Sequence, residues 1–162
     1  MDAYQSAEAI LESFIPRRTV VGVRPHIVKR AAQWFLQNFS GKVLYAVKAN
    51  NSQQILDALY DAGIRCFDVA SLAEMKQLCA FKDIDLHVMN PVKSRDLIAK
   101  AYFDFGVRNF ALDCEAELDK INEVTGFAKD LNLFVRIACD NSTAHVHLNR
   151  KFGISIDKAA DL

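Results

Sequence analysis

The feature that most constrains the fold is a regular alternation of short apolar runs with segments of helical periodicity. The runs have the length of β-strands and are rich in valine, isoleucine and phenylalanine. They are KVLYAV (42–47), RCFDVA (65–70), IDLHVM (84–89), VRNFAL (107–112) and LFVRIA (133–138). Because they recur about every 20–25 residues with a helical segment between them, we predict a parallel sheet built of right-handed βαβ units.

The segments between the runs each carry an apolar face at helical spacing, and a further helix, at 25–39, begins with a proline. Five strand–helix units after a leading helix fit either an open doubly wound sheet or part of a (β/α)8 barrel. The periodicity alone does not separate these two architectures. No GxGxxG or GxxxxGK[ST] loop follows any run, which argues against a dinucleotide site or a P-loop nucleotide site.

The composition is that of one folded domain. The chain has 162 residues, of which 51% are hydrophobic and 25% charged. The 20 basic and 20 acidic residues cancel, which argues against a nucleic-acid or anionic-membrane surface. No apolar stretch approaches the roughly 18 residues of a transmembrane helix, and no signal peptide is visible. The four cysteines are scattered through apolar segments, as reduced thiols are, so we expect a cytoplasmic protein.

One lysine stands out within VLYAVKANN, because it ends an apolar run. Strand alternation places Leu44, Ala46 and Lys48 on one face, with Lys48 at the carboxyl end, where α/β folds place their sites. A buried amine there would favour its neutral, nucleophilic form and could form an imine with a carbonyl compound or with pyridoxal phosphate. The alternative is an ordinary lysine that extends from a strand end into solvent.

Four motifs carry a resemblance to a known family. YAVKAN (45–50) is similar to the pyridoxal-phosphate lysine motif of the fold-type III enzymes, the alanine racemase and ornithine decarboxylase group. CFDVASLAEM (66–75) resembles the FDxASxxE segment of ornithine decarboxylases, and NPVK (90–93) resembles the NPxK turn. RIACDNSTAHVHLNRKFGIS (136–155) resembles the RIAxDxSxAxxxLxxKFG segment. The resemblance, which covers about residues 43–154, implies a (β/α)8 barrel of which this chain supplies about five of the eight strands.

The resemblance also implies a cofactor, pyridoxal 5'-phosphate, and roles for particular residues. Lys48 matches the lysine that holds the cofactor as an imine. Asp68 matches an aspartate near that lysine, whereas its alternative role is to close a turn at a strand end. Glu74 matches the glutamate of the same motif, but a capping box that begins at Ser71 explains it equally well.

Two further matches lie near the end of the chain. Arg136 matches an arginine of the barrel interior, and we expect it to be buried and paired; a structural ion pair, with Asp68 for example, is the alternative. Lys151 matches a lysine of the dimer interface, and its alternative is a solvated loop lysine. His145 and His147 form an HxH pair, but without an acid or cysteine to complete a ligand set we predict no metal site.

Several parts of the family pattern do not occur in the 162 residues. They include the glycine-rich phosphate loop, the acid that pairs with the pyridine nitrogen and the C-terminal β domain. We therefore expect residues 1–162 to be the N-terminal part of the cofactor-binding barrel domain, inactive by itself. The complete enzyme is expected to be a homodimer that decarboxylates a basic amino acid, ornithine or lysine. The alternatives are a racemase-like or cofactor-carrier protein of the same fold group, and a non-catalytic, partner-binding fragment.

Overall fold

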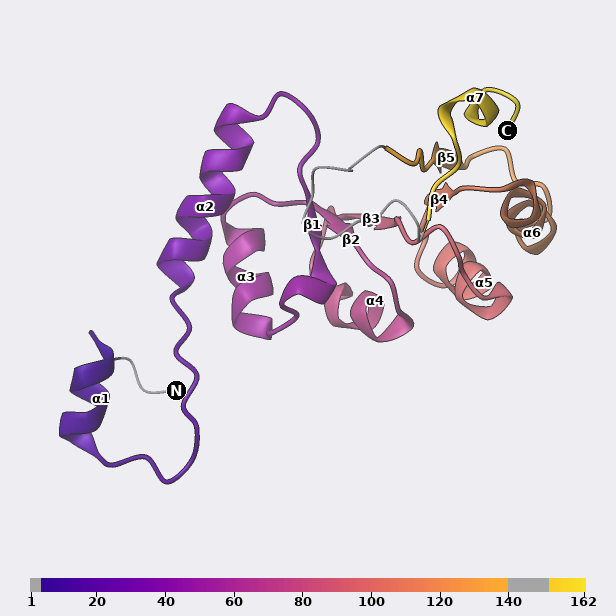
Figure 1. Cartoon of the computed structure of the whole chain (residues 1–162). Coiled ribbons are helices and arrows are strands. Elements are labelled where there is room, and N and C mark those ends of the chain that lie inside the picture. The colour runs from indigo at the N-terminus through magenta and orange to yellow at the C-terminus, as the bar shows by residue number, and fades with distance from the viewer. Residues whose placement is uncertain (1–3, 140–151) are drawn as a thin grey trace.

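The computed structural model describes residues 4–139 and 152–162 and contains one parallel sheet (Figure 1). Its strands are β1 (Leu44–Ala46), β2 (Cys66–Asp68), β3 (Asp85–Val88), β4 (Asn109–Leu112) and β5 (Asn132–Val135). The helices are α1 (Ala7–Ser13), α2 (Pro25–Asn38), α3 (Gln53–Asp61), α4 (Leu72–Leu78), α5 (Arg95–Phe103), α6 (Glu115–Thr125) and α7 (Ile156–Ala159), and the 3-10 turn η1 (Val47–Ala49) follows β1. The five predicted strands are confirmed, each somewhat shorter than its apolar run.

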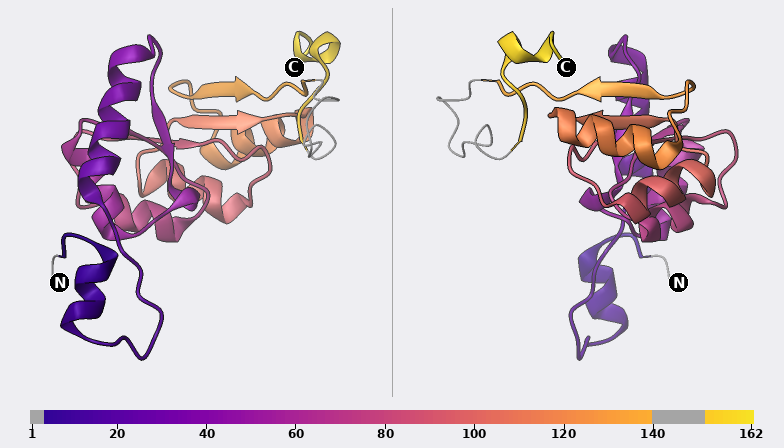
Figure 2. Two further views of the ribbon diagram at one scale, coloured as in Figure 1. Left: turned by 60° about the vertical axis from the view of Figure 1, so that its left-hand side comes forward. Right: turned by 90° about the vertical axis from the view of Figure 1, so that its right-hand side faces the viewer.

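The order of the strands separates the two architectures that the periodicity left open. Each strand pairs in parallel with the next one along the chain, in the order β1-β2-β3-β4-β5. Helices α3, α4, α5 and α6 all lie on the same face of this sheet (Figures 1 and 2). A doubly wound sheet reverses its strand order and carries helices on both faces. The arrangement seen here is that of part of a (β/α)8 barrel, with helices outside and the other face turned inward.

The hydrophobic core lies between the sheet and its helices. Phe67 in β2 and Phe110 in β4 are fully buried there. The helices contribute the apolar faces expected from their spacing, including Leu56 of α3, Ile98 of α5 and Ile121 of α6, none of which is accessible to solvent. Burial of such side chains stabilises a fold by roughly 1.5–3 kcal/mol each, so this layer holds the strands, and therefore their carboxyl ends, in a fixed arrangement.

Residues that pair in register share a face of the sheet, and this rule places a polar row on the inner face. The side chains of Asp85 and His87 lie there, and His87 pairs with Asn109, which pairs with Asn132. The inner face borders an open hollow of about 810 Å³ near Leu44 and Phe134. Leu133, Phe134 and Val135 of β5 are each about two-fifths exposed. The sheet therefore presents an open inner face and two edges, β1 and β5.

The pairing of the chain continues beyond β5 in one place. Ile137 forms an isolated parallel bridge with Ile154. The approach requires glycine at position 153, since a Cβ atom there would lie 2.7 Å from the backbone nitrogen of Ala138, and since φ is +106°. The Gly153 amide donates to Asp113 Oδ2 at 2.9 Å. The segment at Ile154 thus pairs in parallel with the segment that follows β5, as the next strand of a barrel would.

None of the helices in the described ranges, 4–139 and 152–162, combines the length and the apolar character that crossing a membrane requires.

Candidate functional site at the carboxyl ends of β1 and β2

Lys48 lies in η1, directly after β1, and its side chain meets an acid from the neighbouring strand. Its Nζ atom is 3.6 Å from Oδ2 of Asp68, the last residue of β2. The pairing of Ala46 with Asp68 brings these two strand ends together. The predicted position of Lys48 at the carboxyl end of a strand is confirmed, and so is its proximity to Asp68.

Of the two environments that the sequence left open for Lys48, a buried amine and a solvated one, the structure has the solvated one. Its side chain is 66% exposed, whereas that of Asp68 is 17% exposed. The strand stops at Ala46, and η1 turns the chain at the rim of the open inner face. β1 is an edge strand of the described sheet, so no further strand covers Lys48 on that side, and its amine is exposed to solvent. Its reactivity in this structure therefore depends on access and on Asp68, and not on removal from water.

Asp68 has a second partner, which connects it to β3. Its Oδ1 atom accepts a hydrogen bond from the Met89 amide at 3.2 Å, while Oδ2 faces Lys48. Met89 follows the last residue of β3, Val88. Asp68 thus lies beside Lys48, and its other oxygen binds the backbone after β3 instead of closing a turn at the end of its own strand.

The Glu74 carboxylate accepts a hydrogen bond from the backbone just before α4. Ser71 caps this helix by accepting from the Glu74 amide at 3.3 Å, and the Glu74 carboxylate accepts from the Ala70 amide at 2.6 Å. This is the capping arrangement expected from the sequence, with the return bond made to the residue before Ser71. It anchors the segment that follows Asp68, so Glu74 supports the rim of the site through the backbone.

Arg136 does not lie where the sequence suggested. It follows β5 instead of lying within a strand, and its side chain is exposed. Its guanidinium lies 5.4 Å from the centre of the Phe152 ring, a cation–π distance, and no ion pair with Asp68 occurs among the described residues. The expectation of burial failed because β5 is the last strand of the described sheet and its inner face is open. Lys151, His145 and His147 lie outside the described residues.

A second lysine at this end of the sheet, Lys93, was not singled out from the sequence. It lies in the turn between β3 and α5, and its side chain is fully buried. Its Nζ atom is 3.0 Å from Glu117 Oε1 and donates to the carbonyls of Asn90 and Pro91, at 3.0 and 3.3 Å, and to that of Ala111. Burial lowers the pKa of Lys93, and the adjacent Glu117 partly offsets this effect. The NPVK motif was the only signal for it.

A polar cluster lies at the opposite, amino-terminal end of the strands. Asp85 accepts hydrogen bonds from Lys42 at 2.9 Å and Asn109 at 2.7 Å, and it meets His87 Nε2 at 3.0 Å. Burial acts to raise the pKa of Asp85, but Lys42 and His87 more than offset it, so this pKa is lowered. Burial lowers the pKa of His87 despite the neighbouring carboxylate. Burial also raises the pKa of the Cys66 thiol.

Cys66, Asp85 and His87 offer ligand atoms within 4.8 Å of one another. The Asp85 carboxylate is nevertheless already engaged, because Lys42 balances its charge and Asn109 and His87 contact its oxygens. Ring nitrogen Nδ1 of His87 is buried and has no hydrogen-bond partner among the described residues, as expected for a neutral ring that donates through Nε2. This cluster is a hydrogen-bonded network centred on the amino-terminal ends of β2 and β3, and its His87 lies in register with Asp68.

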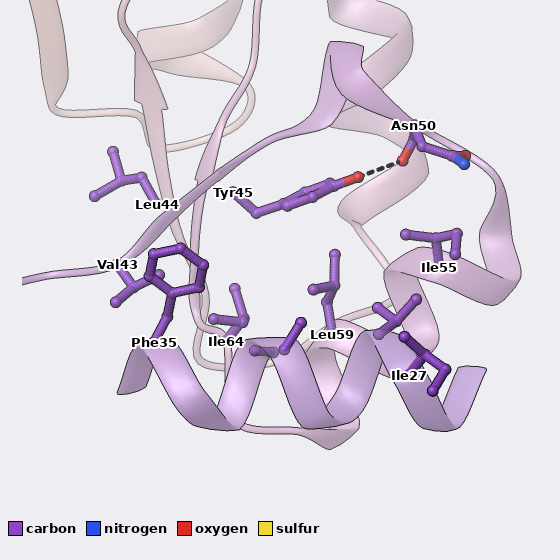
Figure 3. Close-up of a pocket in the computed structure, with 12 residues that line it drawn as sticks. Ile27, Phe35, Val43, Leu44, Tyr45, Asn50, Ile55, Leu59 and Ile64 are labelled. Atoms are coloured by element: carbon purple, nitrogen blue, oxygen red, sulfur yellow. Dashed lines mark hydrogen bonds between the residues drawn. The ribbon is translucent and has the colours of Figure 1, made fainter. Parts of the chain in front are cut away.

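The outer edge of β1 forms one side of an apolar groove. The groove has a volume of about 500 Å³ and lies between α2 and β1, with Ile27 and Phe35 on one side and Val43 on the other (Figure 3). Tyr45 crosses it and donates its hydroxyl to the Asn50 carbonyl at 3.0 Å. That bond connects β1 to the segment after η1, so Tyr45 helps to fix the loop that carries Lys48.

Comparisons with known proteins agree with this geometry. A model of the pyridoxal binding domain of pyridoxal-dependent decarboxylases matches residues 24–162. The lysine/ornithine decarboxylase of Selenomonas ruminantium is 41% identical over 123 residues, which is 74% of this chain and 30% of that protein. The ornithine decarboxylase of Panagrellus redivivus is 33% identical over 135 residues, which is 83% of this chain and 30% of that protein.

Solved structures give the same result. The crystal structure of lysine decarboxylase from Selenomonas ruminantium superposes with a TM-score of 0.78 at 30% identity, covering 99% of this chain and 42% of that one. The arginine decarboxylase of Paramecium bursaria Chlorella virus superposes with a TM-score of 0.71 at 30% identity, covering 83% and 36%. The chain spans about a third of the length of the curated relatives it matches. It belongs to the family of pyridoxal-dependent decarboxylases, within their pyridoxal binding domain.

Proposed function

We propose that the complete protein to which this chain belongs decarboxylates a basic amino acid, ornithine or lysine, with pyridoxal 5'-phosphate, and that Lys48 is the residue that binds the cofactor. The observation that carries the proposal is the Lys48–Asp68 pair, an accessible amine 3.6 Å from a carboxylate at two adjacent strand ends. This pair occurs in a chain that is 41% identical to a lysine/ornithine decarboxylase over 123 residues.

The described residues offer a partner for one part of pyridoxal phosphate, its aldehyde group. Pyridoxal phosphate, when bound, supplies an aldehyde for an amine and a ring that takes up the electrons left by a departing carboxylate. Lys48 presents such an amine at the open rim of the sheet. Asp68 Oδ2 lies 3.6 Å from the amine, where its charge favours the orientation of the amine toward the end of β2, while Oδ1 is kept in position by the Met89 amide. Among the described residues, Lys48 is the accessible lysine at this rim, since Lys93 is enclosed by its four acceptors.

The substrate proposal rests on the relatives. A solved structure of SrLDC, 29% identical and with a TM-score of 0.76, holds PLP and cadaverine. A diamine with a four- or five-carbon chain is the product expected from ornithine or lysine. We also propose, from the resemblance and the composition, that residues 1–162 form the N-terminal part of the cofactor-binding barrel and that the complete protein is a cytoplasmic homodimer.

The test uses the complete protein and its Lys48→Ala variant. Release of CO2 is measured with ornithine, lysine, arginine and diaminopimelate as separate substrates. In parallel, the loaded protein is reduced with borohydride, digested and examined by mass spectrometry for a pyridoxyl group. We expect turnover of ornithine or lysine, labelling at Lys48 and loss of nearly all turnover in Lys48→Ala. Binding of the cofactor without CO2 release would favour a racemase-like or carrier function, and labelling at another lysine would overturn the site.

A further inference from the structure

The buried lysine of the NPVK turn, Lys93, has no part in the site described so far, but it connects to that site through the chain. Its ammonium is enclosed by Glu117 Oε1 and by three carbonyl oxygens, those of Asn90, Pro91 and Ala111. An ammonium has three protons to donate, so all of them are in use. Lys93 is therefore a charged structural group and is not available as a nucleophile.

The acceptors of Lys93 come from three separate parts of the fold. Asn90 and Pro91 belong to its own turn, Ala111 to β4 and Glu117 to the first turn of α6. Glu117 also accepts from the backbone amide of Lys93 at 3.1 Å, and its other oxygen contacts Lys120 at 2.5 Å. One side chain thus fixes the turn after β3 against both β4 and α6. Breaking a buried pair of this kind on one side leaves an uncompensated charge.

The fixed turn leads directly to the candidate site. Met89 immediately precedes Asn90, and its amide donates to Asp68 Oδ1 at 3.2 Å. The other oxygen of Asp68 faces Lys48 at 3.6 Å. The position of the Met89 amide determines which way the carboxylate points, and that position depends on the turn that Lys93 holds.

We propose that Lys93 and Glu117 form a positioning pair for the Lys48–Asp68 site, acting through the turn of residues 89–93. The pair keeps the Met89 amide in place, the amide orients the Asp68 carboxylate, and the carboxylate holds the Lys48 amine toward the inner face. The inference rests on the proposed function only in taking Lys48 as the cofactor lysine. The geometric part of it, the coupling of Lys93 to Asp68, stands on the contacts alone.

The experiment separates positioning from stability by comparing two variants of the complete protein. Lys93→Met removes the charge and leaves Glu117 buried with Lys120 and the backbone amide at position 93 as its remaining partners. The double variant Lys93→Met/Glu117→Gln removes both charges and keeps an oxygen that accepts from the backbone amide at position 93. Replacing a buried ion pair by neutral groups of similar volume is often close to neutral for stability. Lys100→Met is the matched control, since Lys100 forms an exposed pair with Asp96 one helical turn away in α5.

Three quantities are measured on the cofactor-free protein: the melting temperature, the hydrogen-exchange protection of the Met89 amide, and the fraction of Lys48 labelled by pyridoxal phosphate and borohydride at a fixed low concentration. In Lys93→Met we expect all three to fall. In the double variant we expect the melting temperature to recover most of its loss. Protection of Met89 and labelling of Lys48 should stay reduced by about fivefold, roughly 1 kcal/mol. The Lys100→Met control should match the unmodified protein in all three quantities.

Two results would overturn the proposal. One is a double variant in which protection of Met89 and labelling of Lys48 recover together with the melting temperature, because Lys93 would then act on stability alone. The other is a Lys93→Met protein with unchanged protection and labelling. If the single variant does not fold, the double variant decides. Because Met89 protection requires neither cofactor nor substrate, a protein that shows no decarboxylation still tests the coupling of Lys93 to Asp68.

Discussion

Asp68 has two oxygens with different partners, so two substitutions at this position are expected to have different effects. Asp68→Asn removes the charge but keeps an oxygen that accepts from the Met89 amide. The lost ion pair is formed with a lysine that is 66% exposed, and exposed pairs contribute about 0.2–1 kcal/mol to the free energy of unfolding. The melting temperature should therefore fall by no more than about 4 °C. Asp68→Ala also removes the acceptor, and leaving the Met89 amide unpaired costs about 1–3 kcal/mol.

The effect of Asp68→Asn on the cofactor follows from the same geometry. Two unit charges 3.6 Å apart interact by about 1 kcal/mol in water-like surroundings. If that interaction orients the Lys48 amine toward the cofactor, its loss should lower the apparent affinity for pyridoxal phosphate by roughly fivefold. Thermal unfolding of the cofactor-free protein, followed by circular dichroism, gives the stability, and an absorbance titration with the cofactor gives the affinity. Asp61→Asn, which breaks the exposed pair with Lys29, is the control and should leave the affinity unchanged. The reasoning fails if Asp68→Asn lowers the melting temperature as much as Asp68→Ala does while the affinity stays the same.

Three other predictions concern the rest of the fold. Burial lowers the pKa of His87 from its ordinary value of 6.5, so the unfolded chain binds a proton at a higher pH than the folded one does. The free energy of unfolding should therefore decrease as pH falls below about 6.5. Between pH 7.5 and 5.5, the melting temperature of His87→Gln should fall less than that of the unmodified protein, whereas that of a variant of the exposed His26 should fall by the same amount. Gly153→Ala should lower the melting temperature, since its Cβ would meet the Ala138 backbone at 2.7 Å; an unchanged melting temperature would show that the bridge between Ile137 and Ile154 is dispensable. The 162-residue chain expressed alone should self-associate through its open edges β1 and β5, and light scattering that gives a monomer mass at all concentrations would contradict this.

The candidate site could be predicted in part, because its two main residues follow from local pattern. Lys48 directly follows one short apolar run and Asp68 lies in the second half of the next, and parallel strands with helical connections bring the carboxyl ends of such runs to one edge of the sheet. Glu74 was ambiguous in the sequence because the same spacing serves a capping box, and the structure shows its carboxylate bound to the Ala70 amide. For Arg136, the expectation of burial came from the apolar neighbours in its run, and it failed because burial of a strand depends on what packs against both of its faces.

Lys93 is the clearest case of a residue that the sequence could not reveal. A lysine in the turn sequence NPVKS (90–94) is typical of a solvated loop, and its partner Glu117 lies 24 positions away in another strand–helix unit. The two meet only because α6 packs against the turn after β3. Such a pair leaves no periodic trace, so neither its burial nor its coupling to Met89 and Asp68 can be read from the chain.

The sequence by itself determined the number of strands and their positions along the chain, the apolar faces of the helices and the family to which the chain belongs, because each of these depends on local periodicity or on motifs. The tertiary structure alone decided which face of the sheet the helices cover, that Lys48 is exposed and that Lys93 is buried. Exposure is a property of the space around a side chain, and here that space is bounded by strands and helices from distant parts of the chain. The same residue type therefore serves as an accessible amine at the end of β1 and as an enclosed cation two strands away.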